Sequence, residues 1–161
     1  MKIRTIILFF LIFGITGYLR ERFFEHLNII LAGLYRNTDE YALIGIKMPT
    51  VMRPFSQMSY AALYYSKYLF TLIWSIIFFI ISYFALKKLA SNKNILKFLT
   101  WSYLLLLILA GISMAIGYLI NSTLKNDEYT FSRALLGIAQ SPIICLILLA
   151  SQKLYSKSTK L

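Results

Sequence analysis

The chain has 161 residues, of which 59% are hydrophobic, 16% are aromatic and only 14% are charged. A soluble fold of this length has no interior large enough for that apolar fraction, so the composition excludes an ordinary water-soluble domain and indicates a membrane protein. The formal net charge is +11, but the 17 lysines and arginines are scattered at the edges of apolar runs, which argues against binding of nucleic acid.

Four apolar runs predict four transmembrane helices, since about 20 helical residues cross a hydrocarbon core of about 30 Å. The first run resembles a signal peptide, but it continues into Arg20 without a small-residue cleavage site and is interpreted as a retained helix. The predicted fold is an all-α membrane protein with one membrane domain over residues 1–161. Its predicted spans are residues 4–19, 68–86, 98–120 and 134–150.

The segment between the first two spans, residues 20–67, is far longer than a simple connection needs. Within residues 20–36, apolar residues recur at helical spacing, namely Phe23, Leu27, Ile30 and Leu34, with Phe24 and Leu31 alongside. We expect an amphipathic helix on the outer face that either lies in the membrane interface or covers the helix bundle, burying its apolar stripe in lipid or protein.

Turn-forming residues follow this predicted helix. Asn37, Thr38 and Asp39 interrupt the helical pattern, and Pro49 and Pro54 then bracket an irregular stretch. We expect a short re-entrant or surface loop between the two prolines.

The distribution of basic residues predicts the orientation, because positive charge near span ends is retained in the cytoplasm. Nine basic residues and no acidic residue fall on the proposed inner face, whereas the much longer outer segments hold eight basic residues and all 6 acidic residues. Both termini are therefore expected on the cytoplasmic side. The nine are Lys2, Arg4, Lys87, Lys88, Lys93, Lys97, Lys153, Lys157 and Lys160.

The polar residues of the chain predict no cofactor and no metal site. His26 is the only histidine, and a metal site would need further ligands at suitable spacing, so we interpret it as an ordinary surface histidine. Cys145 lies in an apolar run and no Gly-x-Ser-x-Gly elbow surrounds a serine, so a nucleophile paired with His26 is not expected. One hypothesis for a membrane enzyme still remains, which would use His26 with the acids of the outer segment, Glu21, Glu25, Asp39 and Glu40.

The last apolar run contains Gln140, Ser141 and Pro142. Polar side chains in an apolar helix usually hydrogen-bond to neighbouring helices, and proline removes a backbone donor, so we expect a kink. These residues are either a packing device or part of a partner interface. The candidate interface residues of the whole chain are Arg20, Arg22, Glu25, His26, Arg133, Gln140 and Pro142.

The layout of the chain resembles that of the small exosortase-associated membrane proteins of bacteria, particularly the exosortase F-associated type. The stretches that carry the resemblance are YLRERFFEHLN at 18–28, SKYLFTLIWSI at 66–76 and SRALLGIAQSP at 132–142. In the family, the arginine and the Gln-Pro pair are closer together and the pair is contiguous, whereas here Ser141 separates Gln140 from Pro142.

The resemblance implies a non-enzymatic accessory protein of the bacterial inner membrane. Its partners would be the lipid bilayer and a multi-span exosortase, an enzyme that processes proteins with a C-terminal sorting signal, and the catalytic chemistry would belong to that enzyme.

The residues leave a further function open, a small homo-oligomeric transporter or channel. Such a protein needs polar residues along a path through the membrane. The spans offer few of them, chiefly Ser75, Ser82, Ser102, Ser113 and Gln140.

Overall fold

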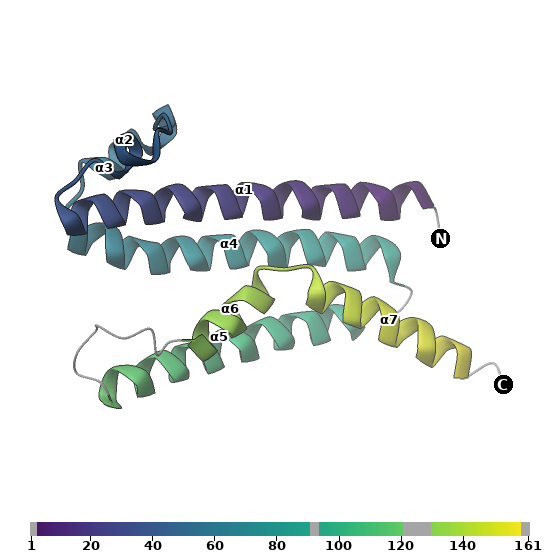
Figure 1. The fold of residues 1–161 in the computed structure, drawn as a ribbon. Coiled ribbons are helices and arrows are strands. Elements are labelled where there is room, and N and C mark those ends of the chain that lie inside the picture. The colour runs from purple at the N-terminus through teal and green to yellow at the C-terminus, as the bar shows by residue number, and fades with distance from the viewer. Residues whose placement is uncertain (1–2, 91–93, 121–129, 159–161) are drawn as a thin grey trace. The chain divides into compact units, whose positions relative to one another are not determined.

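All of the regular structure that is described is helical (Figure 1). A computed structural model describes residues 3–90, 94–120 and 130–158, and no strand occurs within these ranges. Lys2, Lys93 and Lys160, used above for the orientation, lie outside them. The elements are α1 (Ile3–Arg36), α2 (Glu40–Ile44), η1 (Thr50–Met52), α3 (Arg53–Ser56), α4 (Tyr60–Leu89), α5 (Asn94–Ile120), α6 (Thr130–Ala139) and α7 (Ile143–Ser158).

Three helices, α1, α4 and α5, are long and apolar enough to cross a membrane, and α6 with α7 adds a fourth if that bent pair is one span. With 34 residues, α1 is about 51 Å long, well beyond the hydrocarbon core of about 30 Å. Only 6% of its most apolar 18-residue window is buried inside the protein. The all-α prediction is confirmed, and the exposed apolar surface is compatible with contact with lipid.

The amphipathic helix predicted over residues 20–36 is the C-terminal half of α1 and not a separate element. The helix ends where the sequence indicates. Asn37 has a φ of 55°, and the Thr38 N–H donates to the Gly33 carbonyl oxygen at 3.0 Å. This combination of a left-handed residue and a bond back to the helix is a Schellman cap. The connection inside the predicted outer loop 20–67 is therefore shorter than expected and runs from Asn37 to Ser59.

Cα packing divides the chain into two compact units. Unit 1 comprises Met1–Gly14 and Ser75–Leu161, and unit 2 comprises Ile15–Trp74. The single membrane domain over residues 1–161 stays a prediction.

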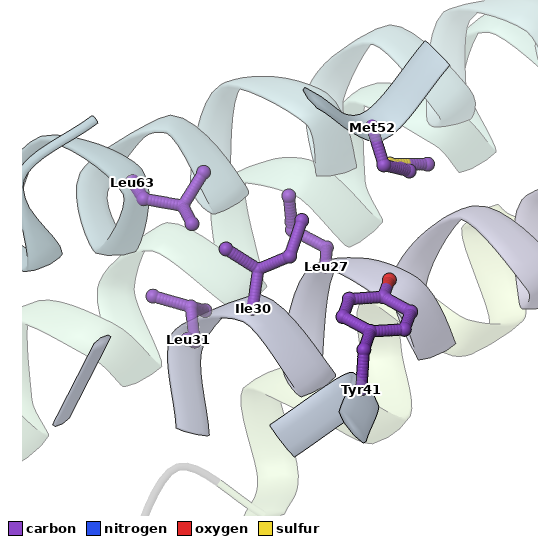
Figure 2. Packing of buried hydrophobic residues seen from close by; sticks show 6 residues of the cluster. All are labelled: Leu27, Ile30, Leu31, Tyr41, Met52 and Leu63. Atoms are coloured by element: carbon purple, nitrogen blue, oxygen red, sulfur yellow. The ribbon is translucent and has the colours of Figure 1, made fainter. Parts of the chain in front are cut away.

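Unit 2 has an apolar core whose buried side chains come from α1, α2, η1 and α4 (Figure 2). The stripe predicted on residues 20–36 supplies half of the six buried side chains, so these residues of the stripe are buried in protein. The segment after α1 folds onto the helices instead of forming a loose loop. The six residues are Leu27, Ile30, Leu31, Tyr41, Met52 and Leu63.

Local caps explain the short elements of unit 2. The Asp39 side chain accepts a hydrogen bond from the Ala42 N–H at 3.3 Å and so caps α2, which ends at Gly45 with a φ of 71°. Pro49 precedes η1, and Pro54 lies in the first turn of α3, where a helix does not need the missing N–H. The stretch expected to be irregular between the two prolines is therefore mostly helical.

In unit 1, α5 packs against α6 and α7. The latter two helices meet at a bend of 63° across Gln140, Ser141 and Pro142. The predicted kink is confirmed. The Leu146 N–H donates to the Pro142 carbonyl oxygen at 3.0 Å and begins the ladder of α7.

Candidate functional site

The predicted interface residues fall into two groups. Arg20, Arg22, Glu25 and His26 lie on α1 in unit 2, whereas Arg133, Gln140 and Pro142 lie on α6 and at the bend in unit 1. The two groups differ in exposure and in what they contact.

The first group includes an exposed charged row on one face of α1. The Arg22 Nη1 donates to the Glu25 Oε2 at 2.9 Å, and its Nε donates to the Tyr18 hydroxyl oxygen at 3.2 Å. The spacings of three and four residues bring these side chains together on the helix surface. With Glu21 they line a hollow of about 370 Å³. The Arg22 guanidinium also lies over the Tyr18 ring, with its carbon 5.5 Å from the ring centroid. We call Tyr18, Arg22 and Glu25 the charged row.

Arg20 is less exposed than this row. Its guanidinium carbon lies 5.6 Å from the centroid of the Phe24 ring. Cation–π contacts of this kind let the stem of the arginine cover an aromatic surface.

His26 ties α1 to α2. Its Nδ1 lies 3.0 Å from the Tyr41 hydroxyl oxygen, and the Tyr41 hydroxyl donates to the His26 carbonyl oxygen at 3.3 Å. When the Tyr41 hydroxyl donates its hydrogen to the His26 carbonyl oxygen, the protonated His26 Nδ1 donates to the Tyr41 hydroxyl oxygen. Burial raises the pKa of Tyr41, and the negative charge of Glu25 raises it further. His26 is partly buried, so the expected surface histidine has a structural contact.

Two of the acids proposed for a membrane enzyme, Asp39 and Glu40, have structural partners in the turn after α1. The Glu40 Oε1 accepts from the Arg36 Nη1 at 3.1 Å and from the Thr38 hydroxyl at 3.1 Å, and only 11% of its side chain is exposed. Asp39 caps α2. In the part of the chain that the structure describes, no three His, Cys, Asp or Glu side chains lie close enough together to hold a metal ion.

A second hollow, of about 410 Å³, lies beside this turn. Its lining includes Gly33, which the sequence reasoning did not single out. A Cβ at Gly33 would lie 2.7 Å from the Thr38 carbonyl oxygen, closer than side chains tolerate. The sequence carried no clear signal for Gly33, because the residue that usually marks a helix end follows the last turn, and here that residue is Asn37. The carboxylates on the wall, Asp39 and Glu40, are those that stabilise the turn.

The second group surrounds the bend in unit 1. Gln140 is buried, and its Nε2 donates to the Ser75 hydroxyl oxygen of α4 at 3.3 Å. The Ser141 hydroxyl donates to the Ile138 carbonyl oxygen at 2.7 Å, and the Ile143 N–H donates to the Ser141 hydroxyl oxygen at 3.4 Å. Hydrogen bonds within the protein thus satisfy backbone groups near the bend. The buried hydrogen bond of Gln140 favours a role in helix packing over a role in a partner interface.

A second buried polar contact joins α4 to α5. The Ser82 hydroxyl oxygen lies 3.5 Å from that of Tyr103, whose ring packs edge-on against Phe79. Ser75 and Ser82 are seven residues apart, about two helical turns, so both lie on one face of α4. That spacing was the sequence signal for a polar seam, but only the fold identifies its partners.

Arg133 is exposed on α6, and Pro142 is half-buried at the bend. Their use in a partner interface stays a prediction. Comparison with known proteins returns no match to any family model, curated protein or solved structure. The exosortase-associated assignment therefore also stays a prediction from sequence layout.

Proposed function

We propose that the chain is a non-enzymatic accessory subunit of a bacterial inner-membrane assembly and that it binds a larger membrane protein through the charged row of α1. One observation carries this proposal. Arg22 and Glu25 are exposed, yet their mutual contact and the contact with Tyr18 hold them in place. Side chains that are already ordered lose less conformational freedom when they bind a partner.

The position of the charged row also supports an interface with a membrane protein. Tyr18 lies at the predicted outer end of the first span, and Glu25 follows about two turns later. A multi-span partner would present its own surface at the same depth in the membrane. The layout resemblance makes an exosortase-like enzyme the expected partner, and an exosortase gene next to the gene for this chain would support it.

The proposed topology has four spans, with both termini in the cytoplasm. α6 has 10 residues and α7 has 16, so their lengths are about 15 Å and about 24 Å. If the bend of 63° is shared equally about the membrane normal, the full lengths of α6 and α7 project to about 33 Å, against a hydrocarbon core of about 30 Å. This length includes Arg133 and Lys153 near its two ends, where long basic side chains can reach the headgroups.

In this topology the second half of α1 is the amphipathic segment of the outer face. Its apolar stripe, with Leu27 and Ile30, faces the core of unit 2. The charged row lies on the exposed surface of the same helix, so one element both supports the fold and binds the partner.

Purification in a mild detergent, followed by identification of the co-purifying chains, tests the proposal. The informative variant exchanges the two charges, Arg22→Glu with Glu25→Arg. The exchange keeps an exposed ion pair on the helix, so stability should change little. The charges offered to the partner are inverted, and like charges across an interface cost several kcal/mol. We expect the exchange to reduce recovery of the partner at least tenfold.

Lys67→Gln is the matched control. It removes another exposed polar contact of unit 2, the 2.8 Å hydrogen bond from the Lys67 Nζ to the Asn28 Oδ1, and should leave recovery of the partner unchanged. Equal recovery with the charge-exchanged chain would show that the charged row is not the interface. A wild-type chain that purifies alone in several mild detergents would contradict the accessory function itself.

A further inference from the structure

The stretch from Lys47 to Ser56, which we call the outer strap, exposes a large apolar side chain outside the predicted spans. Val51 is 77% exposed, whereas its neighbour Met52 is buried in the core of unit 2. η1 therefore holds the backbone in place through Met52 and leaves Val51 on the surface. A single exposed valine is ordinary on a protein surface, so a contact is indicated instead by the depth of the strap and by its charged neighbours.

Three aromatic rings indicate the depth of Phe55, near the C-terminal end of the outer strap. The Phe55 ring centroid lies 6.1 Å from that of Phe23 and 5.5 Å from that of Phe70, and the latter two are 5.0 Å apart. Phe70 lies two residues inside the predicted second span. Phe23 lies four residues, about 6 Å, beyond the predicted end of the first. Phe55 is therefore at the outer edge of the hydrocarbon core, because the headgroup region extends about 5–8 Å beyond it in each leaflet.

The charge of the outer strap is complementary to lipid phosphate. Lys47 and Arg53 flank Val51, both are exposed, and no acidic residue lies between them. The two ion pairs found among the described residues involve neither, since they use Glu25 and Glu40. A guanidinium forms strong charge-assisted hydrogen bonds with phosphate oxygens.

We infer that the outer strap docks on the outer leaflet of the membrane as a lipid-binding element. Val51 enters the boundary between headgroups and acyl chains, and Lys47 and Arg53 contact phosphate groups of anionic lipids. This inference rests on the proposed membrane topology. It assigns the outer strap to lipid, whereas the charged row of α1 is assigned to a protein partner.

A depth measurement with three labelled positions tests this inference. In a full chain with Cys145→Ala, single cysteines replace Val51, Ile7 in the predicted first span, or Tyr35 near the end of α1. All three native side chains are exposed, so a label at these positions does not disturb the core. Each protein carries a fluorescent label and is placed in nanodiscs of equal parts phosphatidylcholine and phosphatidylglycerol. The quenchers are a headgroup nitroxide, a chain-centre nitroxide and aqueous iodide.

We expect the label at position 51 to be quenched mainly by the headgroup nitroxide, and the label at position 7 mainly by the chain-centre nitroxide. The label at position 35 should respond to iodide alone, because Tyr35 lies twelve residues, about 18 Å, beyond Phe23 along α1. If position 51 responds only to iodide while position 7 responds to lipid, the strap does not bind lipid but the topology stands. If position 7 does not respond to lipid, the topology itself is wrong.

Two further results complete the test. A label at position 51 that is shielded from all three quenchers would mean that a protein, such as a second copy of the chain, covers the strap, and this would overturn the inference.

Replacing Lys47 and Arg53 by Gln should reduce the ratio of docked to undocked strap by about fivefold per cation in the same nanodiscs. Lys67→Gln is the control and should leave quenching at position 51 unchanged, and equal effects of the two changes would contradict the role of the phosphate contacts.

Discussion

The core of unit 2 and the bend of unit 1 are stabilised by different means. Around Leu27 the buried side chains are almost entirely apolar, whereas around Gln140 a buried amide and buried hydroxyls meet between helices. Apolar burial drives association in water, but lipid tails are as apolar as leucine, so helices in a membrane depend more on close packing and hydrogen bonds. In the proposed topology the core of unit 2 lies outside the hydrocarbon layer and the bend lies inside it. The apolar core and the polar contacts at the bend agree with this placement.

Truncation of Leu27 should have the largest effect. Leu27 is fully buried, so Leu27→Ala is expected to lower the free energy of unfolding by about 2–5 kcal/mol through lost apolar contacts and a cavity. Leu43→Ala is the control, because Leu43 is 70% exposed, and it should change stability by less than about 0.5 kcal/mol. Thermal unfolding in detergent, followed by circular dichroism, measures both. Equal losses would mean that the core of unit 2 does not form as described.

Alanine at two helical glycines compares the units directly. Gly33→Ala places a Cβ against the Thr38 carbonyl oxygen, and the resulting shift of the cap should cost about 1–3 kcal/mol, more than the gain of about 1 kcal/mol in helix propensity. Gly137→Ala in α6 meets nothing within 4 Å and should be neutral or stabilising. The same unfolding measurement applies. A stabilised Gly33→Ala chain would refute the tight turn after α1.

The hydrogen bond between Gln140 and Ser75 should have a smaller effect. A double-mutant cycle with Gln140→Leu and Ser75→Ala is expected to give a coupling free energy of about 0.6 kcal/mol, with an upper value of about 1.7 kcal/mol, typical of hydrogen bonds between membrane helices. Unfolding in mixtures of SDS and a mild detergent gives the four stabilities. Additive changes would show that the two side chains do not interact.

The smallest expected effect concerns Tyr41 at alkaline pH. Because its pKa is raised above the usual 10.0, folding favours the neutral phenol, and this contribution is present below pH 10.0 and is lost as the pH rises through the folded value. Tyr41→Phe should therefore lose less stability than the wild type as the pH rises above 10.0. Tyr35→Phe, at an exposed tyrosine, should follow the wild type. Parallel curves for Tyr41→Phe and the wild type would exclude a buried, neutral Tyr41.

Local features of the structure could be predicted from the sequence. Asn37 marked the end of α1, Pro142 marked the bend, and the spacing of Phe23, Leu27 and Ile30 marked the face that packs in unit 2. Each depends on residues within a few turns of one another, where backbone preferences and helical periodicity act.

Contacts between distant parts of the chain could not be predicted. The Gln140 amide meets Ser75, 65 residues away, and His26 meets Tyr41 from another helix. Several polar residues of the sequence could form a hydrogen bond with Gln140 or with His26. Only the three-dimensional fold identifies the actual partners. The continuity of α1 through Arg20 was expected only as one span running into a second helix, because a charged residue after an apolar run also suits a turn at the membrane surface.

The bend at Pro142 also has a consequence for how the chain enters the membrane during synthesis. α6 has 10 residues and α7 has 16, each shorter than the roughly 17–25 residues of an independent span. In the proposed topology neither half can be inserted alone, so the translocation machinery must accept both as one unit after α5. A truncation near Ser141 would therefore leave α6 unable to cross, because the second half of the span would be missing.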